Sequence, residues 1–184
     1  MLIFVDTNVW YPISVADLIL RSVEAGMFEL AWSDESMGEL ERIVVSVKGL
    51  EPAKARVFIE QIEATAPAGR VDPRTYQHLE SQMIGRDPGD HVFSAAVQGG
   101  KIDVFLTENI SDFPKGDLGP SAKALRPDDF FSEFLKNFPL EFVTLIKEMS
   151  ANLKRPPLSE FDVLERLEKS GMPNFAKEMR DLLA

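Results

Sequence analysis

Residues 1–10 read MLIFVDTNVW, an apolar stretch that runs directly into an aspartate. The four apolar residues at positions 2–5 predict a buried strand. A strand of this kind should end in a turn, yet Asp6, Thr7 and Asn8 follow it, and then more apolar residues. Three successive hydrogen-bonding side chains are more than a turn requires. Asp6 is therefore a candidate functional residue at the end of a strand.

Length and composition limit the class of protein. The 184 residues suffice for one well-filled core, and the net charge of −10 repels nucleic acid unless a bound cation or a basic patch compensates. Cysteine is absent, which excludes a disulfide scaffold and a thiol enzyme and fits the cytoplasm. Because no apolar run reaches the length of a membrane span, we expect no membrane partner.

The hydrophobic pattern predicts strands that alternate with helices. We expect strands at residues 2–5, 28–32, 104–107 and 122–125. We expect helices at residues 15–25, from Ser33 to about residue 47, at 53–64, 73–83, 87–98 and 130–135. Parallel strands need helical crossovers, so this alternation predicts an α/β fold with a parallel sheet.

The pattern changes after Asn137. Only helices are expected there, at residues 140–153, 159–170 and 174–183. We therefore predict two domains, an α/β domain of residues 1–137 and an all-α extension of residues 138–184. The extension has enough apolar residues to cover a face of the main domain, which favours packing over contact with RNA or a protein partner.

Several acidic residues are expected at one edge of the sheet. Asp6 ends the first strand, and Asn109 and Asp112 follow the third. Asp90 lies at the start of a buried helix, and Glu39 lies on the helix after the second strand. Loops at the carboxyl ends of parallel strands meet in one crevice, so these side chains should converge. Converging carboxylates repel unless a cation neutralises them, which predicts a magnesium or manganese site.

Each of these residues also has a purely structural explanation. Capping or turn roles are the alternative for three of the acids: Asp6, Asp90 and Asp112. Asp87, which precedes a proline, is best explained as a helix N-cap. Glu39 and Glu41 flank the apolar stripe of their helix equally. His78 and His91 have no partner at ligand spacing, so neither is a zinc candidate.

Four segments of the chain resemble the motifs of the PIN domain family. FVDTNVW, SDESMGELERIVV, DPGDHVFSAAVQGG and FLTENISDFP occur in that family's order and approximate spacing. They are most similar to the VapC-type ribonuclease toxins of prokaryotic toxin–antitoxin pairs. The resemblance covers residues 1 to about 137, and the helical tail resembles an extension found on one branch of these toxins. It implies a Rossmann-like parallel sheet, flanked by helices, with an acidic pocket that binds Mg²⁺ or Mn²⁺.

The resemblance also implies roles for individual residues. The implied catalytic residues are Asp6, Glu39, Asp90 and Asp112. The implied metal ligands are Asp6, Asp90, Asp112 and Asn109. The implied supporting residues are Thr7, Asn8 and Thr107. Many relatives have an aspartate at the position of Asn109, whereas this chain has its acid three residues later. Glu39 would be a ligand or would orient the attacking water.

The implied reaction is divalent-metal-dependent hydrolysis of RNA phosphodiesters, leaving 5′-phosphate and 3′-hydroxyl ends. The implied partners are the RNA substrate, a cognate antitoxin and a second copy of the chain, since the family commonly forms homodimers. We expect the antitoxin groove at the helices after strands one and two, including Leu18. The basic residues that are candidates to hold flanking RNA are Lys101, Lys115, Lys123, Arg126, Lys154 and Arg155.

Two other functions compete with this interpretation. A phosphatase with an aspartate nucleophile would need a second acid two residues after Asp6, but Asn8 stands there. A catalytically weak or inactive PIN-like module could instead bind metal and serve as a protein-interaction platform. Asn109 is the residue that favours this second alternative. Metal binding without RNA cleavage would distinguish it from a nuclease.

Overall fold

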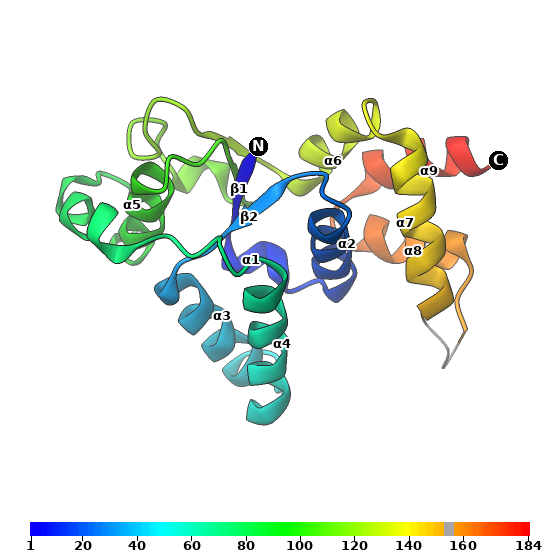
Figure 1. Ribbon diagram of the computed structural model, residues 1–184, viewed down its shortest axis with the longest axis horizontal. Coiled ribbons are helices and arrows are strands. Elements are labelled where there is room, and N and C mark those ends of the chain that lie inside the picture. Colours follow the sequence, from blue (N-terminus) through cyan, green and yellow to red (C-terminus); the bar gives the residue numbers. More distant parts are fainter. Residues whose placement is uncertain (153–156) are drawn as a thin grey trace.

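A parallel sheet lies at the centre of the computed structural model, which describes residues 1–152 and 157–184 (Figure 1). The strand order is β2–β1–β3–β4. The strands are β1 (Leu2–Val5), β2 (Glu29–Ala31), β3 (Val104–Leu106) and β4 (Lys123–Leu125). All three pairings are parallel, which confirms the predicted α/β class.

Helices connect the strands, and they are the main elements of the described residues after β4. The α-helices are α1 (Thr7–Trp10), α2 (Ile13–Glu24), α3 (Asp34–Ser46), α4 (Pro52–Thr65), α5 (His91–Gly99), α6 (Pro127–Leu135), α7 (Pro139–Asn152), α8 (Glu160–Lys169) and α9 (Pro173–Leu183). The 3-10 helices are η1 (Pro73–Thr75), η2 (Gln77–Gln82), η3 (Pro88–Asp90) and η4 (Ile110–Asp112). Hydrogen-bonded capping boxes begin α3 at Ser33 and α8 at Ser159.

The alternation of side chains along β1 divides the interior into two cores. Ile3 and Val5 lie in the larger core, which α2, α3 and the C-terminal helices complete. Phe4 points to the other face of the sheet, where Phe105 and residues of α5 form a smaller core. Figure 1 shows α5 on one side of the sheet and α2 with α6–α9 on the other. The sheet is therefore covered on both faces, as parallel sheets require.

The C-terminal helices share the larger core with the rest of the chain. Phe142, Leu167 and Phe175 are fully buried in it, whereas Leu182 is 49% exposed. A buried carboxylate adds a polar tie, because Asp128 at the start of α6 accepts hydrogen bonds from the backbone N–H groups of Asn174 and Phe175 at the start of α9. The extension is thus packed against the α/β part, while the domain boundary at residue 137 stays a prediction.

Three segments differ from the sequence-based expectation. The prediction of an α-helix at residues 73–83 is wrong, since the 3-10 helices η1 and η2 occupy this segment. Tyr76 is fully buried here, and a Cβ on Gly99 of α5 would lie 2.6 Å from the Thr75 carbonyl oxygen. This close packing on α5 outweighs the local helical pattern. The sequence also gave no signal for the short helix α1, and the helix expected from Asp87 becomes α-helical only at His91. The predicted end of one helix, Leu153, lies outside the described residues.

Candidate functional site

Asp6 lies at the carboxyl end of the central strand β1. The register pairs Val5 with Leu106, and the Asp6 N–H donates to the Leu106 carbonyl at 2.9 Å, so Asp6 lies beside the end of β3. Its Oδ2 accepts hydrogen bonds from the Thr107 hydroxyl at 2.6 Å and from the Asn8 Nδ2 at 2.7 Å. Two polar neighbours therefore hold this carboxylate in one orientation.

The environment of Asp6 opposes its negative charge. The residue is only 8% exposed, and burial raises the pKa of its carboxyl above the ordinary value. Hydrogen bonds from Thr107, Thr7 and Asn8 act in the opposite direction without cancelling the effect of burial. A cation beside Asp6 would remove the cost of this buried charge.

Glu39 faces the same region from helix α3. Its Oε2 is 3.5 Å from the Thr7 hydroxyl, which is also 3.4 Å from Asp6 Oδ1, so one hydroxyl lies between the two acids. Burial raises the pKa of Glu39, and the charge of Asp6 raises it further, although Arg42 lowers it from 3.5 Å. Glu41, the alternative considered from the sequence, lies instead 3.8 Å from Arg56 on α4.

Asp90 is the most strongly perturbed acid of this group. Its carboxyl pKa is raised from 3.8 to about 6. Burial is the largest cause, and the like charges of four other acids add to it: Asp87, Asp6, Glu39 and Asp112. Asp90 therefore lies within electrostatic reach of every other acid predicted for the site. Asp90 and the four acids whose charges act on it are defined here as the acidic cluster: Asp6, Glu39, Asp87, Asp90 and Asp112.

Asn109 and Asp112 lie on the turn that follows β3. The Asp112 N–H donates to the Asn109 carbonyl at 3.0 Å, and the Asn109 N–H donates to the Thr107 hydroxyl at 3.0 Å. The same hydroxyl bonds to Asp6, so Thr107 connects this turn with the end of β1. The Asn109 side chain is exposed and forms no hydrogen bond with the residues that the structure describes.

The donor set of the acidic cluster fits a hard divalent cation. Its groups are carboxylate oxygens, and Asn109, on the same turn as Asp112, adds an amide oxygen. Oxygen atoms of these two kinds are the ligands that Mg²⁺ and Mn²⁺ take in proteins. The buried, poorly solvated charge of Asp6 is the observation that favours a cation there. Within residues 1–152 and 157–184, no three acidic or histidine side chains are already close enough together to ligate one ion. The ligands would have to close around the cation as it binds.

Three contributions to this region were not predicted from the sequence. Asp87 adds charge to the acidic cluster besides capping η3 through the Gly89 N–H. Arg42 lies beside Glu39, one helical turn away, a spacing that the sequence did contain. The Glu108 N–H donates to Asn8 Oδ1 at 3.3 Å, across 100 positions of the chain. No local pattern can reveal a contact of that kind.

The remaining candidates from the sequence are histidines and basic residues. His91 bonds through Nε2 to the Gly85 carbonyl at 2.8 Å, and His78 is exposed. The basic residues considered for RNA contact are exposed wherever the structure describes them: Lys101, Lys115, Lys123 and Arg126. Lys154 and Arg155 lie outside the described residues.

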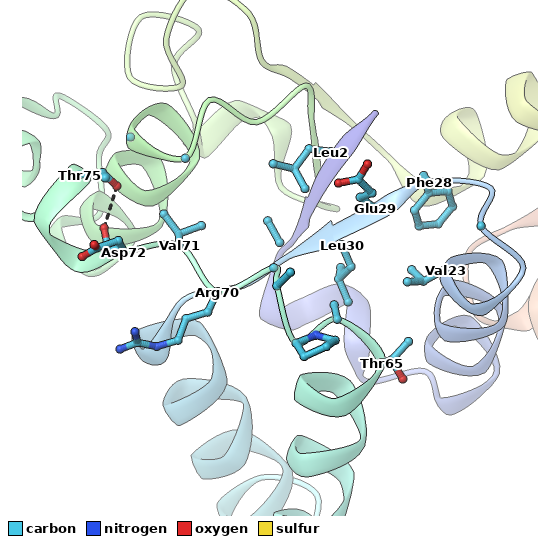
Figure 2. A pocket seen from close by; sticks show the side chains of 18 residues that line it. Leu2, Val23, Phe28, Glu29, Leu30, Thr65, Arg70, Val71, Asp72 and Thr75 are labelled. Atoms are coloured by element: carbon cyan, nitrogen blue, oxygen red, sulfur yellow. Dashed lines mark hydrogen bonds between the residues drawn. The ribbon is translucent and has the colours of Figure 1, made fainter.

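A cavity of about 730 Å³ lies along the outer edge of β2, where mainly apolar side chains line it (Figure 2). Leu2 and Glu29, the first residues of β1 and β2, belong to its wall, whereas Asp6 lies at the opposite end of β1. No residue of the acidic cluster lines this cavity. The chemistry-bearing groups are therefore at the carboxyl ends of the strands, outside the cavity.

Comparison with known families agrees with this architecture. Residues 3–111 match the family model of the PIN domain, and the chain belongs to the PIN domain family. Residues 127–181 match the model of the VapC50 C-terminal domain, which makes the chain a VapC-type PIN protein with a C-terminal extension. Curated proteins and solved structures gave no match. Among the described residues, no helix is both long and apolar enough to cross a membrane. The family membership identifies a nuclease of the VapC toxin class.

Proposed function

We propose that the protein is a divalent-metal-dependent endoribonuclease, the toxin of a type II toxin–antitoxin pair. The observation that carries this proposal is the acidic cluster, in which Asp6 ends β1, Asp112 follows β3, and Asp90 lies within electrostatic reach of the four other acids. A hydrolase that bears a net charge of −10 needs positive charge where it meets a polyanion. Bound metal, rather than basic side chains, would supply it.

Asp6, Asp90, Asp112 and Asn109 would hold the metal, which we expect to be Mg²⁺ or Mn²⁺. When bound, such a cation activates water and neutralises charge at the scissile phosphate. The Thr107 hydroxyl and the Asn8 amide keep the Asp6 carboxylate oriented through bonds of 2.6 and 2.7 Å. This orientation before substrate binding reduces the reorganisation that catalysis would otherwise require.

Glu39 has a different setting from Asp6. It is half-buried and lies next to both Thr7 and Arg42. From there it would ligate the metal or accept a proton from the attacking water, and its raised pKa suits proton transfer. A substitution that keeps metal binding but abolishes cleavage would assign the second role.

The partners follow from the toxin class. RNA is the proposed substrate, a cognate antitoxin the proposed inhibitor, and a homodimer the proposed assembly. The absence of cysteine suits a reducing cytoplasm, where we place the activity. A metal-binding platform without nuclease activity is the second candidate, favoured by the amide of Asn109 at a position where many relatives have an acid.

The test is cleavage of end-labelled transfer RNA and total RNA with Mg²⁺, with Mn²⁺ and with a chelator. The comparison variants are Asp6→Asn and Asp103→Asn. Asp103 is a matched control because it is also an aspartate next to a strand, and its carboxylate also accepts a hydrogen bond. It differs in place, since it precedes β3, where its Oδ2 accepts a hydrogen bond from the Leu2 N–H. We expect divalent-dependent cuts that persist in Asp103→Asn and fall at least 100-fold in Asp6→Asn. Metal binding in calorimetry without any cut would favour the platform.

A further inference from the structure

The loop of residues 84–90 brings Asp87 and Asp90 to the acidic cluster, yet it buries little apolar surface. Met83 before it is buried, whereas Ile84 is 76% exposed and Arg86 to Gly89 are also exposed. The hydrophobic core therefore does little to specify the conformation of this loop. Repulsion among the acids would push it away from the sheet. Some other interaction must hold it in place.

Asp117 provides that interaction from a neighbouring turn. The residue is 4% exposed, and its Oδ2 accepts hydrogen bonds from the backbone N–H groups of Ile84 at 2.8 Å and Gly85 at 2.9 Å. A buried carboxylate is costly unless it is hydrogen-bonded, and these two donors compensate for its burial. Both hydrogen bonds come from the loop, so the Asp117 carboxylate binds the loop backbone at two successive residues.

The turn that carries Asp117 is itself firmly anchored. Phe113 is 5% exposed and packs edge-on against Phe105 of β3, with ring centroids 4.7 Å apart. Leu118, on the other side of Asp117, is 2% exposed in the same core. The anchor at Asp117 is thus rigidly connected to the central sheet.

Gly85 is the point at which the loop meets this anchor. Its carbonyl oxygen is 2.8 Å from Nε2 of His91, the first residue of α5. A Cβ on Gly85 would lie 3.2 Å from the carbonyl oxygen of Asp112, so the two acid-bearing segments are in close contact here. The contact at Gly85 therefore fixes the distance between the loop and the Asp112 turn, close to the acidic cluster.

We propose that Asp117 is a positioning residue of the metal site. It holds the loop of Asp87 and Asp90 against the turn of Asp112 and so keeps these carboxylates near enough to close around one cation as it binds. This inference rests on the proposed function, because it concerns the same metal site. Asp117 touches neither the metal nor the substrate in this account. It acts through the backbone of Ile84 and Gly85.

The test compares Asp117→Ala, Asp117→Asn and the control Asp103→Ala in the full-length protein. Asp103 also accepts one backbone N–H, from Leu2 at 2.8 Å, but at the far end of the sheet. Mn²⁺ affinity is measured by electron paramagnetic resonance of the free ion, and hydrogen exchange of residues 84–90 by mass spectrometry. RNA cleavage is followed as a function of Mn²⁺ concentration.

We expect Asp117→Ala to weaken Mn²⁺ binding about tenfold, as loss of a group that supports metal ligands typically does. The loop should exchange faster, and raised Mn²⁺ should restore much of the cleavage rate. Asp117→Asn keeps an acceptor oxygen and should remain within about threefold of the wild type, as should Asp103→Ala. A folded Asp117→Ala protein with wild-type affinity and loop exchange would overturn the proposal, and so would an Asn variant as defective as the Ala variant.

A second pair of variants tests the same contact from the loop side. Ile84→Pro deletes one of the two donated N–H groups and leaves Asp117 intact, whereas Ile84→Ala keeps that donor. We expect Mn²⁺ affinity to fall severalfold only in the proline variant, and equal affinities in both would contradict the proposal. If the wild type bound no Mn²⁺, the proposed function would fail, while unchanged loop exchange in these variants would refute the anchoring separately.

Discussion

Replacing Asp90 with asparagine should make the metal-free protein more stable at neutral pH. The Asp90 pKa is raised from 3.8 to about 6 by burial and by the neighbouring acids. Because the folded state favours the protonated acid, the contribution of Asp90 to stability is greatest below pH 4. It decreases as pH rises through the interval from 3.8 to about 6. Asparagine does not titrate, so its contribution stays constant.

The size of this effect follows from the shift. A change of about two pKa units corresponds to about 3 kcal/mol between the two protonation states. Asp90 is only half-buried, so solvent screening should reduce the effect to about 1 kcal/mol. For a chain of this size that amounts to a Tm difference of about 2–4 °C. We therefore expect the free energy of unfolding of Asp90→Asn to rise by about 1 kcal/mol relative to that of the wild type between pH 4 and pH 7.5.

The assay is urea unfolding of both proteins in a chelator at several pH values. Any difference in packing between the two side chains adds a constant, so only the change with pH is interpreted. Addition of Mg²⁺ at pH 7.5 should stabilise the wild type more than the variant and reduce the gap. A gap that does not change with pH would refute the reasoning, and so would equal stabilisation of both proteins by Mg²⁺.

Two further predictions concern hydrogen bonds that hold the site and the extension in place. Thr107→Val removes the hydroxyl that bonds Asp6 and the Asn109 N–H, and should lower the free energy of unfolding by about 1–3 kcal/mol and weaken Mn²⁺ binding. Thr144→Val, on an exposed face of α7, is its control, and equal losses of stability in urea would contradict the prediction. Asp128→Ala leaves the Asn174 and Phe175 donors unpaired and should cost about 2–4 kcal/mol, with faster hydrogen exchange in α9. The control is Asp129→Ala, at the exposed neighbouring residue, which should change the free energy of unfolding in urea by less than about 0.5 kcal/mol. Hydrogen exchange in α9 that matches the wild type in both variants would show that Asp128 does not hold α9 in place.

Much of the fold is visible in the sequence because its strands and long helices have clear hydrophobic periods. The four expected strands and the amphipathic helices α2, α3 and α8 occur close to their predicted bounds. The expectation failed at residues 73–83, where buried Tyr76 and the close approach to Gly99 impose 3-10 turns. Helix α1 has four residues, which is too short for any period to show.

The candidate site is predictable to a different extent. Asp6 and Asp112 follow strands, so their position can be inferred from the usual location of sites in parallel sheets. The residues that support the acids are harder to find, because they act across the chain. Asp117 bonds Ile84 from 33 positions away, and Thr107, which only the family resemblance implied as a supporting residue, bonds Asp6 from 101. Neither contact follows from local sequence, since each depends on how separate loops pack.

The central claim is that the acidic cluster holds a catalytic divalent cation, and anomalous diffraction from a crystal grown with Mn²⁺ tests it most directly. The account predicts a manganese peak bound by Asp6 together with oxygens from the loops of Asp90 and Asp112. That peak should be absent in crystals of Asp6→Asn grown in the same way. A wild-type crystal with no peak at this place, or with manganese bound only elsewhere on the surface, would contradict the account.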